Sequence, residues 1–259
     1  MTAPDLLSTL ARREQLLTQL REAPRAKSDL VADLDVSRST VDRAVRKLEE
    51  AGLLERRDGV VALTLAGRLV FDEYRQFRER TDGVLAAREA LAALPADTDV
   101  DPAALAGAEV TLADRTAPYR PAERQSALIE RATRADLLGT AVAPRFVEAY
   151  RAAILDGTEV RAAVTPVVAE SLVVDHAEAL SEMLSTGRLA LRVLDTTPPF
   201  SLTRFELEGD DERLALMIRS ADGPRAHVQN DTDAAVSYAA DYFERHWARA
   251  DPLSPAEAG

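Results

Sequence analysis

The chain has 259 residues, with 44 Asp or Glu against 32 Lys or Arg, a net charge of −12 and no cysteine. The lack of cysteine excludes disulfides, thiolate catalysis and cysteine-based zinc sites. A transmembrane helix needs about 18 consecutive apolar residues, and the sequence contains no such run. Because the N-terminus lacks the apolar stretch of a signal peptide, we expect a cytoplasmic protein that has no membrane partner.

The first predicted elements are short helices. Apolar residues recur with helical spacing over residues 5–22, and Pro24 ends this first helix. Ser28 is the expected N-cap of a second helix. A tight turn at residues 35–36 and a further cap candidate, Ser37, then introduce a third helix. This succession predicts a helix-turn-helix.

The third helix, residues 38–51, has two distinct faces. Val41, Val45 and Leu48 form an apolar face, and Gly52 follows as a residue able to end the helix in the left-handed conformation. The opposite face carries Arg38, Ser39, Asp42, Arg43 and Arg46. Because arginine pairs with guanine in the major groove, this face suits insertion into DNA. Ion pairs between Asp42 and the arginines one turn away, on a solvated helix, are the alternative.

Two short strands follow directly. Residues 53–57 and 60–63 are joined by Asp58 and Gly59, which are typical of a type I′ turn. A helix-turn-helix followed by a hairpin is a winged helix, and the arginines beside the hairpin tip are placed to reach phosphate or the minor groove. We expect DNA contacts from Lys27, Ser37, Arg38, Ser39, Thr40, Asp42, Arg43, Arg46, Arg56 and Arg57.

The charge is distributed unevenly along the chain. Residues 1–80 hold 15 Lys or Arg and 14 Asp or Glu, whereas residues 81–259 hold 17 and 30. This asymmetry favours a nucleic-acid-facing N-terminal part. Lys27 and Lys47 are the lysines of the chain. An acidic, lysine-poor composition is typical of a halophilic protein, and a genome rich in Arg, Ala and Asp codons is the alternative explanation.

The run DVSRSTVDRAVRKLEEAGLLERRDGVVALTLAGRL resembles the winged-helix module of archaeal and bacterial MarR/ArsR-like transcription regulators. In those regulators the pattern Ser-x-Ser-Thr-Val-x-Arg marks the recognition helix that leads into the wing. The same pattern begins here at Ser37, and Leu48, Gly52 and Leu53 continue it. The resemblance covers residues 5–70 and implies sequence-specific binding to double-stranded DNA.

Thr64 is expected to cap a long helix over residues 65–94. Within it, a stripe of residues in alternating steps of four and three forms about three heptads: Val70, Tyr74, Phe77, Thr81, Val84, Arg88 and Leu91. The polar Thr81 and Arg88 interrupt this stripe, and Gly83 weakens it. A dimerisation helix fits a homodimer that reads a two-fold operator. Packing of the stripe against the chain's own C-terminal domain is the alternative.

Residues 95–104 form a polar, proline-bounded linker that separates two domains. Beyond it, helices are predicted at residues 122–134, 145–155, 167–185 and 232–250. Strands are predicted at residues 108–112, 137–142, 158–165, 189–195, 200–207, 213–219 and 225–229. The alternation predicts an α/β domain over residues 105–250 with a mostly parallel or mixed sheet, followed by a flexible tail at residues 251–259. The whole chain is expected to be α/β, with a winged helix over residues 1–64.

The sequence lacks the familiar catalytic motifs. It contains no Walker loop, dinucleotide-binding fingerprint, nucleophile elbow or His-Glu-x-x-His zinc motif. His176, His227 and His246 are scattered without metal-ligand spacing. We expect no enzyme activity, no cofactor and no metal.

Residues 105–250 resemble the effector domain of archaeal regulators related to the TrmB sugar sensors and to the methanogenesis-regulator (FilR-type) family. Those domains look like phospholipase D half-domains, whose signature is His-x-Lys followed by Asp. Here Gln229 stands in place of Lys, two residues after His227. The resemblance therefore implies a non-catalytic sensor in a haloarchaeal regulator. A phospholipase-D-like phosphodiesterase and a winged-helix protein–protein interaction module are the alternatives.

Open α/β sheets usually bind ligands at the carboxyl ends of their strands. Two loops and an arginine-rich turn are expected there, and a further arginine opens a helix whose N-terminus favours anions. The ligand contacts are expected from Arg115, Tyr119, Arg120, Arg145, Asp195, Thr196, Asn230 and Asp231. These side chains suit a sugar or an anionic metabolite, and ordinary caps or surface salt bridges are the alternative.

Overall fold

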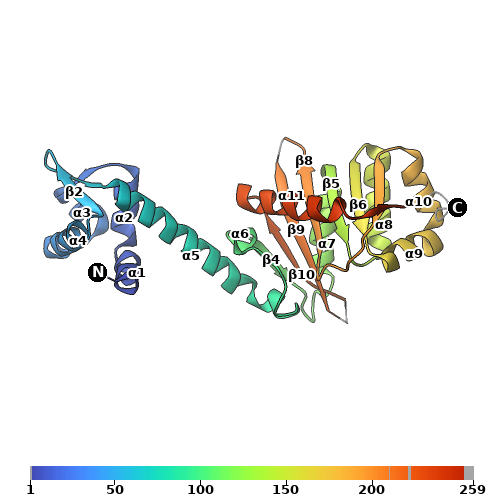
Figure 1. Ribbon diagram of the computed structural model, residues 1–259, viewed down its shortest axis with the longest axis horizontal. Helices are drawn as coiled ribbons and strands as arrows, with labels where there is room; N and C mark the ends of the chain where they lie inside the picture. The colour runs from blue at the N-terminus through green and yellow to red at the C-terminus, as the bar shows by residue number, and fades with distance from the viewer. Residues whose placement is uncertain (1, 210, 221–222, 254–259) are drawn as a thin grey trace. The chain divides into compact units, whose positions relative to one another are not determined.

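The structure is a computed structural model that describes residues 2–209, 211–220 and 223–253. The chain divides into two compact units, residues 1–79 and residues 80–259 (Figure 1). Among the described residues, no helix combines the length and the apolar character needed to cross a membrane.

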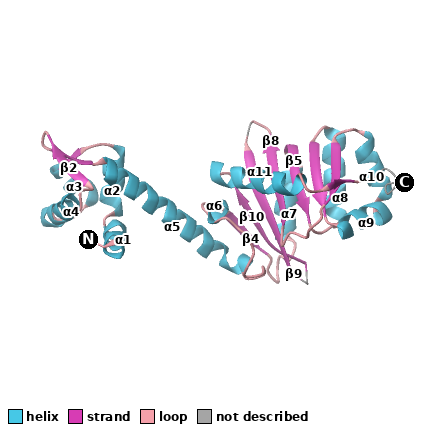
Figure 2. Cartoon of the chain, viewed as in Figure 1, coloured by secondary structure: helices cyan, strands magenta, loops and turns pink. Residues whose placement is uncertain are grey.

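The N-terminal unit packs helices against a small antiparallel sheet (Figure 2). Its helices are α1 (Ala3–Arg12), α2 (Glu14–Glu22), α3 (Lys27–Leu34), α4 (Arg38–Glu50) and the first part of α5 (Leu65–Leu91). Its strands are β1 (Arg25–Ala26), β2 (Leu54–Arg57) and β3 (Val60–Leu63), in the order β1-β3-β2. Leucines, valines and Phe71 form its core. The helix-turn-helix followed by a hairpin is the winged-helix arrangement predicted from the sequence.

Local signals fix the ends of α4 and the hairpin turn. The Ser37 hydroxyl accepts a hydrogen bond from the backbone N–H of Thr40, which confirms the predicted N-cap. Gly52 has φ of 73° just after the helix, as predicted. Asp58 and Gly59 have φ of 50° and 82°, so both central residues adopt the left-handed conformation of a type I′ turn.

Two predictions for the N-terminal unit are wrong. The single helix over residues 5–22 is two helices, broken at Arg13, which has φ of −120° and ψ of 17°. Each helix buries leucines of its own, so the apolar periodicity continues across the break and hides it. Ser28 does not cap α3, because β1 pairs with β3 up to Ala26 and the helix begins at the next residue.

The C-terminal unit is built around one large sheet. Its helices beyond α5 are α6 (Pro102–Leu105), α7 (Arg120–Ile129), α8 (Pro144–Asp156), α9 (Pro166–Asp175), α10 (Ala177–Ser185) and α11 (Asp233–Trp247). Its strands are β4 (Glu109–Leu112), β5 (Ala132–Gly139), β6 (Glu159–Val164), β7 (Leu189–Val193), β8 (Ser201–Leu207), β9 (Glu212–Ser220), β10 (Gly223–Asn230) and β11 (Asp251–Pro252).

The sheet is mixed, in the order β11-β7-β6-β5-β8-β9-β10-β4. The pairs β5–β6 and β6–β7 are parallel, and the remaining neighbours are antiparallel. Of the two arrangements predicted, the mixed sheet is therefore correct and the mostly parallel sheet is wrong. The hairpins β8–β9 and β9–β10 return the chain without helical crossovers, which makes this half of the sheet antiparallel.

Side chains of alternate residues along the strands pack into two separate hydrophobic cores, one on each face of the sheet. Leu138, Leu202 and Leu216 point to the face covered by α6 and α11. Ala162 and Phe205 belong to the opposite core, which is covered by helices that include α8, α9 and α10 (Figure 2). The sheet therefore separates two apolar layers, as its two-residue period requires.

Several predicted boundaries in this unit are wrong. The helix predicted over residues 122–134 ends at Ile129, and its last residues belong to β5. The helix predicted over residues 167–185 is broken at His176, which has φ of −132°. Part of the predicted linker is α6, where Leu105 is buried. Residues 251–252 of the predicted tail pair with β7, and residues 254–259 lie outside the described residues.

The predicted heptad stripe of α5 is divided between the two cores. Val70 and Tyr74 pack in the core of the N-terminal unit. Val84 and Leu91 pack against a core of the C-terminal unit. Phe77, between the two pairs, is 60% exposed. Val84 and Leu91 therefore follow the alternative interpretation, packing against the C-terminal domain, whereas Val70 and Tyr74 pack within the N-terminal unit.

Trp247, the one tryptophan of the chain, lies at the end of α11. Its ring stacks on Phe243, with 5.4 Å between ring centroids. The guanidinium of Arg192 lies 4.3 Å from its centroid, and that of Arg161 lies 5.6 Å away. Arg192 also donates a hydrogen bond to the Trp247 carbonyl at 2.8 Å. These contacts tie the end of α11 to β6 and β7.

Candidate functional site

The outer face of α4 presents arginines that form no ion pair with a described residue. Val41, Ala44, Val45 and Leu48 are buried against the rest of the unit, which turns the other side of the helix to solvent. Arg38, Arg43 and Arg46 are exposed there. Within the described part of the chain, none of the three forms an ion pair.

The ion pairs proposed as the alternative for this face do not form. Asp42 instead accepts a hydrogen bond from Nζ of Lys27 at 2.6 Å. This hydrogen bond holds the pKa of the Asp42 carboxyl below its usual value. Lys27 therefore neutralises the acidic group on this face, and Arg38 and Arg46 remain available to an external anion.

The other side chains predicted to contact DNA differ in how strongly they are engaged in hydrogen bonds or ion pairs within the protein. The hydroxyl of Ser37 lies 3.0 Å from that of Ser39 and 2.8 Å from that of Thr40, in a cluster at the start of α4. In the wing, Arg56 pairs with Glu49 at 2.7 Å and Arg57 with Glu55 at 2.9 Å. Both wing arginines are largely exposed, so an external phosphate competes with a weak surface pair.

The predicted ligand residues do not gather in one pocket. Asn230 is buried, and its amide donates to the carbonyls of Ala104 and Ala106 while its oxygen accepts from the N–H of Thr232. Asp231 pairs with Arg213, and Arg120 pairs with Asp114. The remaining members, Arg115, Tyr119, Arg145, Asp195 and Thr196, are exposed, as are Arg120 and Asp231. Their role in ligand binding stays a prediction.

A cavity of about 110 Å³ lies between the sheet and α8, and none of the eight predicted ligand residues lines it. Its walls come from α7 to α10 and from strands β5 to β9, and they are mostly aliphatic. The polar side chains among them are Gln125, Tyr150, Ser201 and Arg219. The sequence does not reveal this cavity, because its lining residues have the same spacing and composition as a packed core.

Buried polar side chains linked by hydrogen bonds lie beside the cavity. Nε2 of His227 lies 3.0 Å from Oε1 of Gln125, whose Nε2 donates to the Thr203 hydroxyl at 3.3 Å. The Tyr150 hydroxyl is buried beside Gln125 and Thr203 without a hydrogen bond of normal geometry. Burial raises the pKa of Tyr150 to about 12. Burial, with a smaller contribution from Arg124, lowers the pKa of His227 to about 4.

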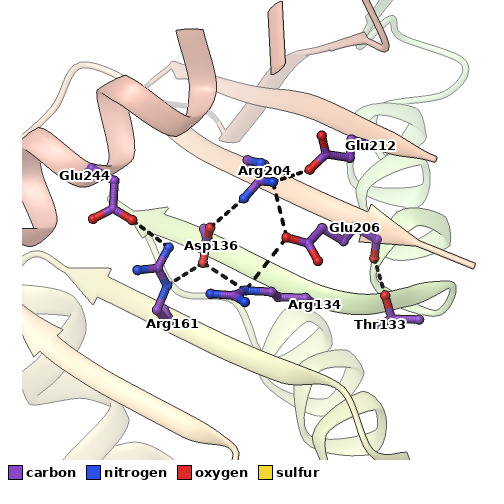
Figure 3. A network of polar contacts seen from close by, with 8 residues as sticks. All are labelled: Thr133, Arg134, Asp136, Arg161, Arg204, Glu206, Glu212 and Glu244. Carbon is purple, nitrogen blue, oxygen red and sulfur yellow. Dashed lines mark hydrogen bonds and ion pairs between the residues drawn. The ribbon is translucent and has the colours of Figure 1, made fainter. Parts of the chain in front are cut away.

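On the opposite face of the sheet, three arginines surround one buried carboxylate (Figure 3). Asp136, with 2% of its side chain exposed, accepts from Nε of Arg161 at 2.7 Å and from Nη1 of Arg204 at 3.3 Å, and Nε of Arg134 lies 3.8 Å away. The arginines in turn contact Glu206, Glu212 and Glu244. The network joins four strands to α11, and the Nε atoms of Arg134 and Arg204 are buried in it without a hydrogen bond to a described residue.

No metal centre is formed by the described side chains. No group of three or more His, Cys, Asp or Glu among them could hold an ion. His227 faces Gln125, and Gln229 donates to Glu109 at 2.6 Å. The arrangement around β10 thus offers one buried neutral imidazole and an amide, and the nearby Arg124 pairs with Glu109 at 3.4 Å.

Two protein families match the chain. The family described as "Methanogenesis regulatory protein FilR1, middle domain" matches residues 118–249. The family described as "HVO_A0261 N-terminal domain" matches residues 2–85. No curated protein matches the chain. The first match covers just over half of the chain and confirms the FilR-type resemblance predicted for its second half.

Solved structures are similar at low sequence identity. TrmBL2, described as an archaeal chromatin protein with a novel mode of DNA binding, is 14% identical with a TM-score of 0.43, over 89% of this chain and 88% of that chain. Nuc, a phospholipase D family member from Salmonella typhimurium, is 12% identical with a TM-score of 0.44, over 56% of this chain and 97% of that chain. NucT from Helicobacter pylori is 8% identical with a TM-score of 0.42, over 56% and 98%.

Proposed function

Because the chain belongs to the family defined by the middle domain of the methanogenesis regulatory protein FilR1, we propose that it is a sequence-specific DNA-binding transcription regulator. Its N-terminal unit reads an operator in double-stranded DNA through α4. Its C-terminal unit binds a small molecule that modulates this binding.

The observation that carries the proposal is the outer face of α4. The Ser37 cap fixes the start of the helix, and the buried valines and Leu48 fix which side faces outward. Arg43 and Arg46 then project from the exposed side without ionic partners among the described residues. An arginine held this way reaches a guanine edge or a phosphate without first losing an internal ion pair.

Substitution of these arginines tests the DNA-binding part of the proposal. Genome-wide mapping of binding sites provides the operator, and fluorescence anisotropy then measures the affinity for it. We expect Arg43→Ala and Arg46→Ala each to weaken binding by about 1–3 kcal/mol, the usual contribution of one base contact. Arg68→Ala, which changes an exposed arginine of α5 in the same unit, serves as the matched control.

The outcome that contradicts DNA reading by α4 is equal operator affinity in all four proteins. A winged helix that binds another protein would also leave DNA affinity unchanged in the two α4 variants. Folding of each variant is checked by circular dichroism, since both substituted side chains are exposed and their loss leaves the core intact.

Several features support a C-terminal unit that senses rather than hydrolyses. His227 is fully buried and contacts Gln125, and Gln229 occupies the place of the phosphate-binding lysine. A nucleophilic histidine needs access to a phosphate and a cation that holds it. A phosphodiesterase assay on the wild type and on His227→Ala checks this, and phosphodiesterase activity that disappears in the variant would overturn the non-enzymatic assignment.

Regulation is proposed to act through the geometry of a homodimer. The two recognition helices of a dimer must match successive major grooves about 34 Å apart, so a ligand that changes their spacing changes DNA affinity without touching a base contact. Sedimentation analysis tests the dimer, and operator affinity across a metabolite panel tests the modulation. A monomer, or an affinity that no metabolite alters, contradicts the corresponding part.

A further inference from the structure

The cavity beneath α8 is too large to be a packing defect. Protein interiors rarely contain voids larger than one water molecule, and one water needs only about 10–15 Å³ of such space. The volume here is about 110 Å³. An engineered apolar cavity of about 150 Å³ binds benzene. The space therefore fits a single ring or a short branched chain.

Aliphatic side chains make up most of the cavity wall. Ala162 and Val164 of β6 form part of the floor, and Val147 and Ile154 of α8 form part of the roof. Hydrogen-bonding groups in this inner part are limited to Gln125, which is already bonded to His227 and Thr203, and the Tyr150 hydroxyl. A sugar, which needs many hydrogen bonds, does not suit such walls, whereas an apolar body does.

One end of the cavity is electropositive. Arg219 lies two residues beyond Met217 on β9, on the same face of the sheet, and both line the cavity. Ser201, which pairs in register with Met217, adds a hydroxyl that accepts from the N–H of Thr140 at 3.1 Å. Arg219 forms no ion pair within the described residues. A half-buried cation that no described carboxylate pairs with favours an anionic group at this end.

The start of α8 adds to the same positive potential. Ala143 is the N-cap of α8, lines the cavity, and has no side chain able to cap the helix. The positive end of the helix dipole therefore lies at the cavity without a capping group to offset it. Arg219, the Ser201 hydroxyl and this helix end all favour a ligand with one carboxylate.

We infer that the cavity beneath α8 binds a compact apolar carboxylic acid, with an aromatic ring or a branched chain in the aliphatic part and its carboxylate at Arg219. This inference rests on the proposed function only in taking that acid as the effector. Binding itself follows from the cavity and its charged end.

Calorimetric titration of the full chain tests the inference with matched pairs of probes. Benzoate and 3-methylbutanoate are the acids, and benzyl alcohol and 3-methylbutanol are neutral molecules of similar shape. We expect the acids to bind saturably and the alcohols to bind at least about tenfold more weakly, because a hydrogen bond to a charged group is stronger than one to a neutral group.

Three variants assign the binding to this cavity. Arg219→Gln should abolish the preference for acid over alcohol, and Ala162→Val should weaken both classes by filling the floor. Arg249→Gln changes an exposed arginine outside the cavity and should bind like the wild type. Because Arg219 is only half-buried, we expect Arg219→Gln to fold. This variant can therefore test the inference even if Ala162→Val fails to fold.

The inference is overturned if none of the four probes binds, or if acids and alcohols bind equally and Arg219→Gln changes neither. Operator affinity measured with saturating benzoate separates the two proposals. Acids that bind through Arg219 without altering DNA affinity support the cavity assignment and contradict an effector role. The effect of the α4 variants on DNA binding tests only the proposed DNA-binding role of the N-terminal unit.

Discussion

At the scale of single residues, two buried ionisable groups differ in the partners that the fold gives them. His227 is buried without a charged partner in contact, so its neutral form is favoured and its pKa falls to about 4. Asp136 is equally buried but accepts hydrogen bonds from Arg161 and Arg204. Removing one partner from such a buried group typically costs about 3–5 kcal/mol. Asp136 is thus paired with two arginines, whereas the buried ring of His227 contacts the neutral amide of Gln125.

The His227 environment predicts a loss of stability in mild acid. In the unfolded chain His227 takes up a proton near its ordinary pKa of 6.5, whereas in the folded chain it stays neutral down to about 4. The stabilising effect is complete above pH 6.5 and is lost as the pH falls towards 4. The expected difference between about pH 7.5 and about pH 5 is about 2 kcal/mol in the free energy of unfolding.

Urea unfolding at the two pH values measures this effect. His227→Gln removes the titrating group and should reduce the pH dependence by that amount. His176→Gln, at the junction of α9 and α10, is the control and should keep the wild-type dependence. An unchanged pH dependence in His227→Gln would mean that the ring is not buried as a neutral group.

At the scale of elements, two glycines let α5 approach other backbones. A Cβ at Gly67 would lie 2.0 Å from the carbonyl oxygen of Leu53, and one at Gly83 would lie 2.1 Å from that of Leu105. Both distances are far below contact distance. Gly83 therefore does not simply weaken the helix, as its propensity predicts; it permits close packing within the C-terminal unit.

Gly83→Ala should consequently destabilise the protein. In an exposed helix interior, Gly→Ala stabilises by about 1 kcal/mol, but here the methyl group must displace the backbone of α6. We expect a net loss of about 1–3 kcal/mol, in the range of overpacked cores. Thermal unfolding measures it, with Glu73→Ala on the exposed side of α5 as control. A higher melting temperature for Gly83→Ala would contradict the close approach.

Elements defined by neighbouring residues could be predicted from the sequence. Ser37, the valine stripe and Gly52 all act within α4, and each is confirmed. The start of β5 could not be predicted, because Arg134 and Asp136 look like surface residues until β6 and β8 supply their partners. The hydrogen bonds from the Asn230 amide to the carbonyls of Ala104 and Ala106 also depend on residues distant in sequence. The same is true of the cavity, whose lining comes from several helices and strands.

At the scale of the whole molecule, the acid excess lies in the part of the sequence beyond residue 80. The proposed reader is nearly neutral in total, and α4 exposes three arginines that pair with no carboxylate among the residues the structure describes. At about 1 M salt the Debye length is only about 3 Å. Repulsion between DNA and the acidic residues beyond residue 80 is therefore screened, while contacts at base edges persist.

DNA affinity should accordingly depend weakly on salt. Phosphate contacts lose most of their counterion-release gain in concentrated salt, so base contacts and DNA shape dominate the binding that remains. We expect a shallow or even inverted dependence of operator affinity between about 0.2 M and about 2 M KCl, measured by fluorescence anisotropy. A steep fall in affinity across this range would refute the halophilic interpretation.

Trp247 gives the two units different optical signatures. Because it is the one tryptophan and is held between Arg192, Arg161 and Phe243, intrinsic fluorescence excited at the indole band reports on the end of α11 and is blind to the N-terminal unit. Far-ultraviolet circular dichroism records the helices of both units. Two unfolding curves that fail to superimpose would therefore reveal that the units melt independently, without any label having been attached to the chain.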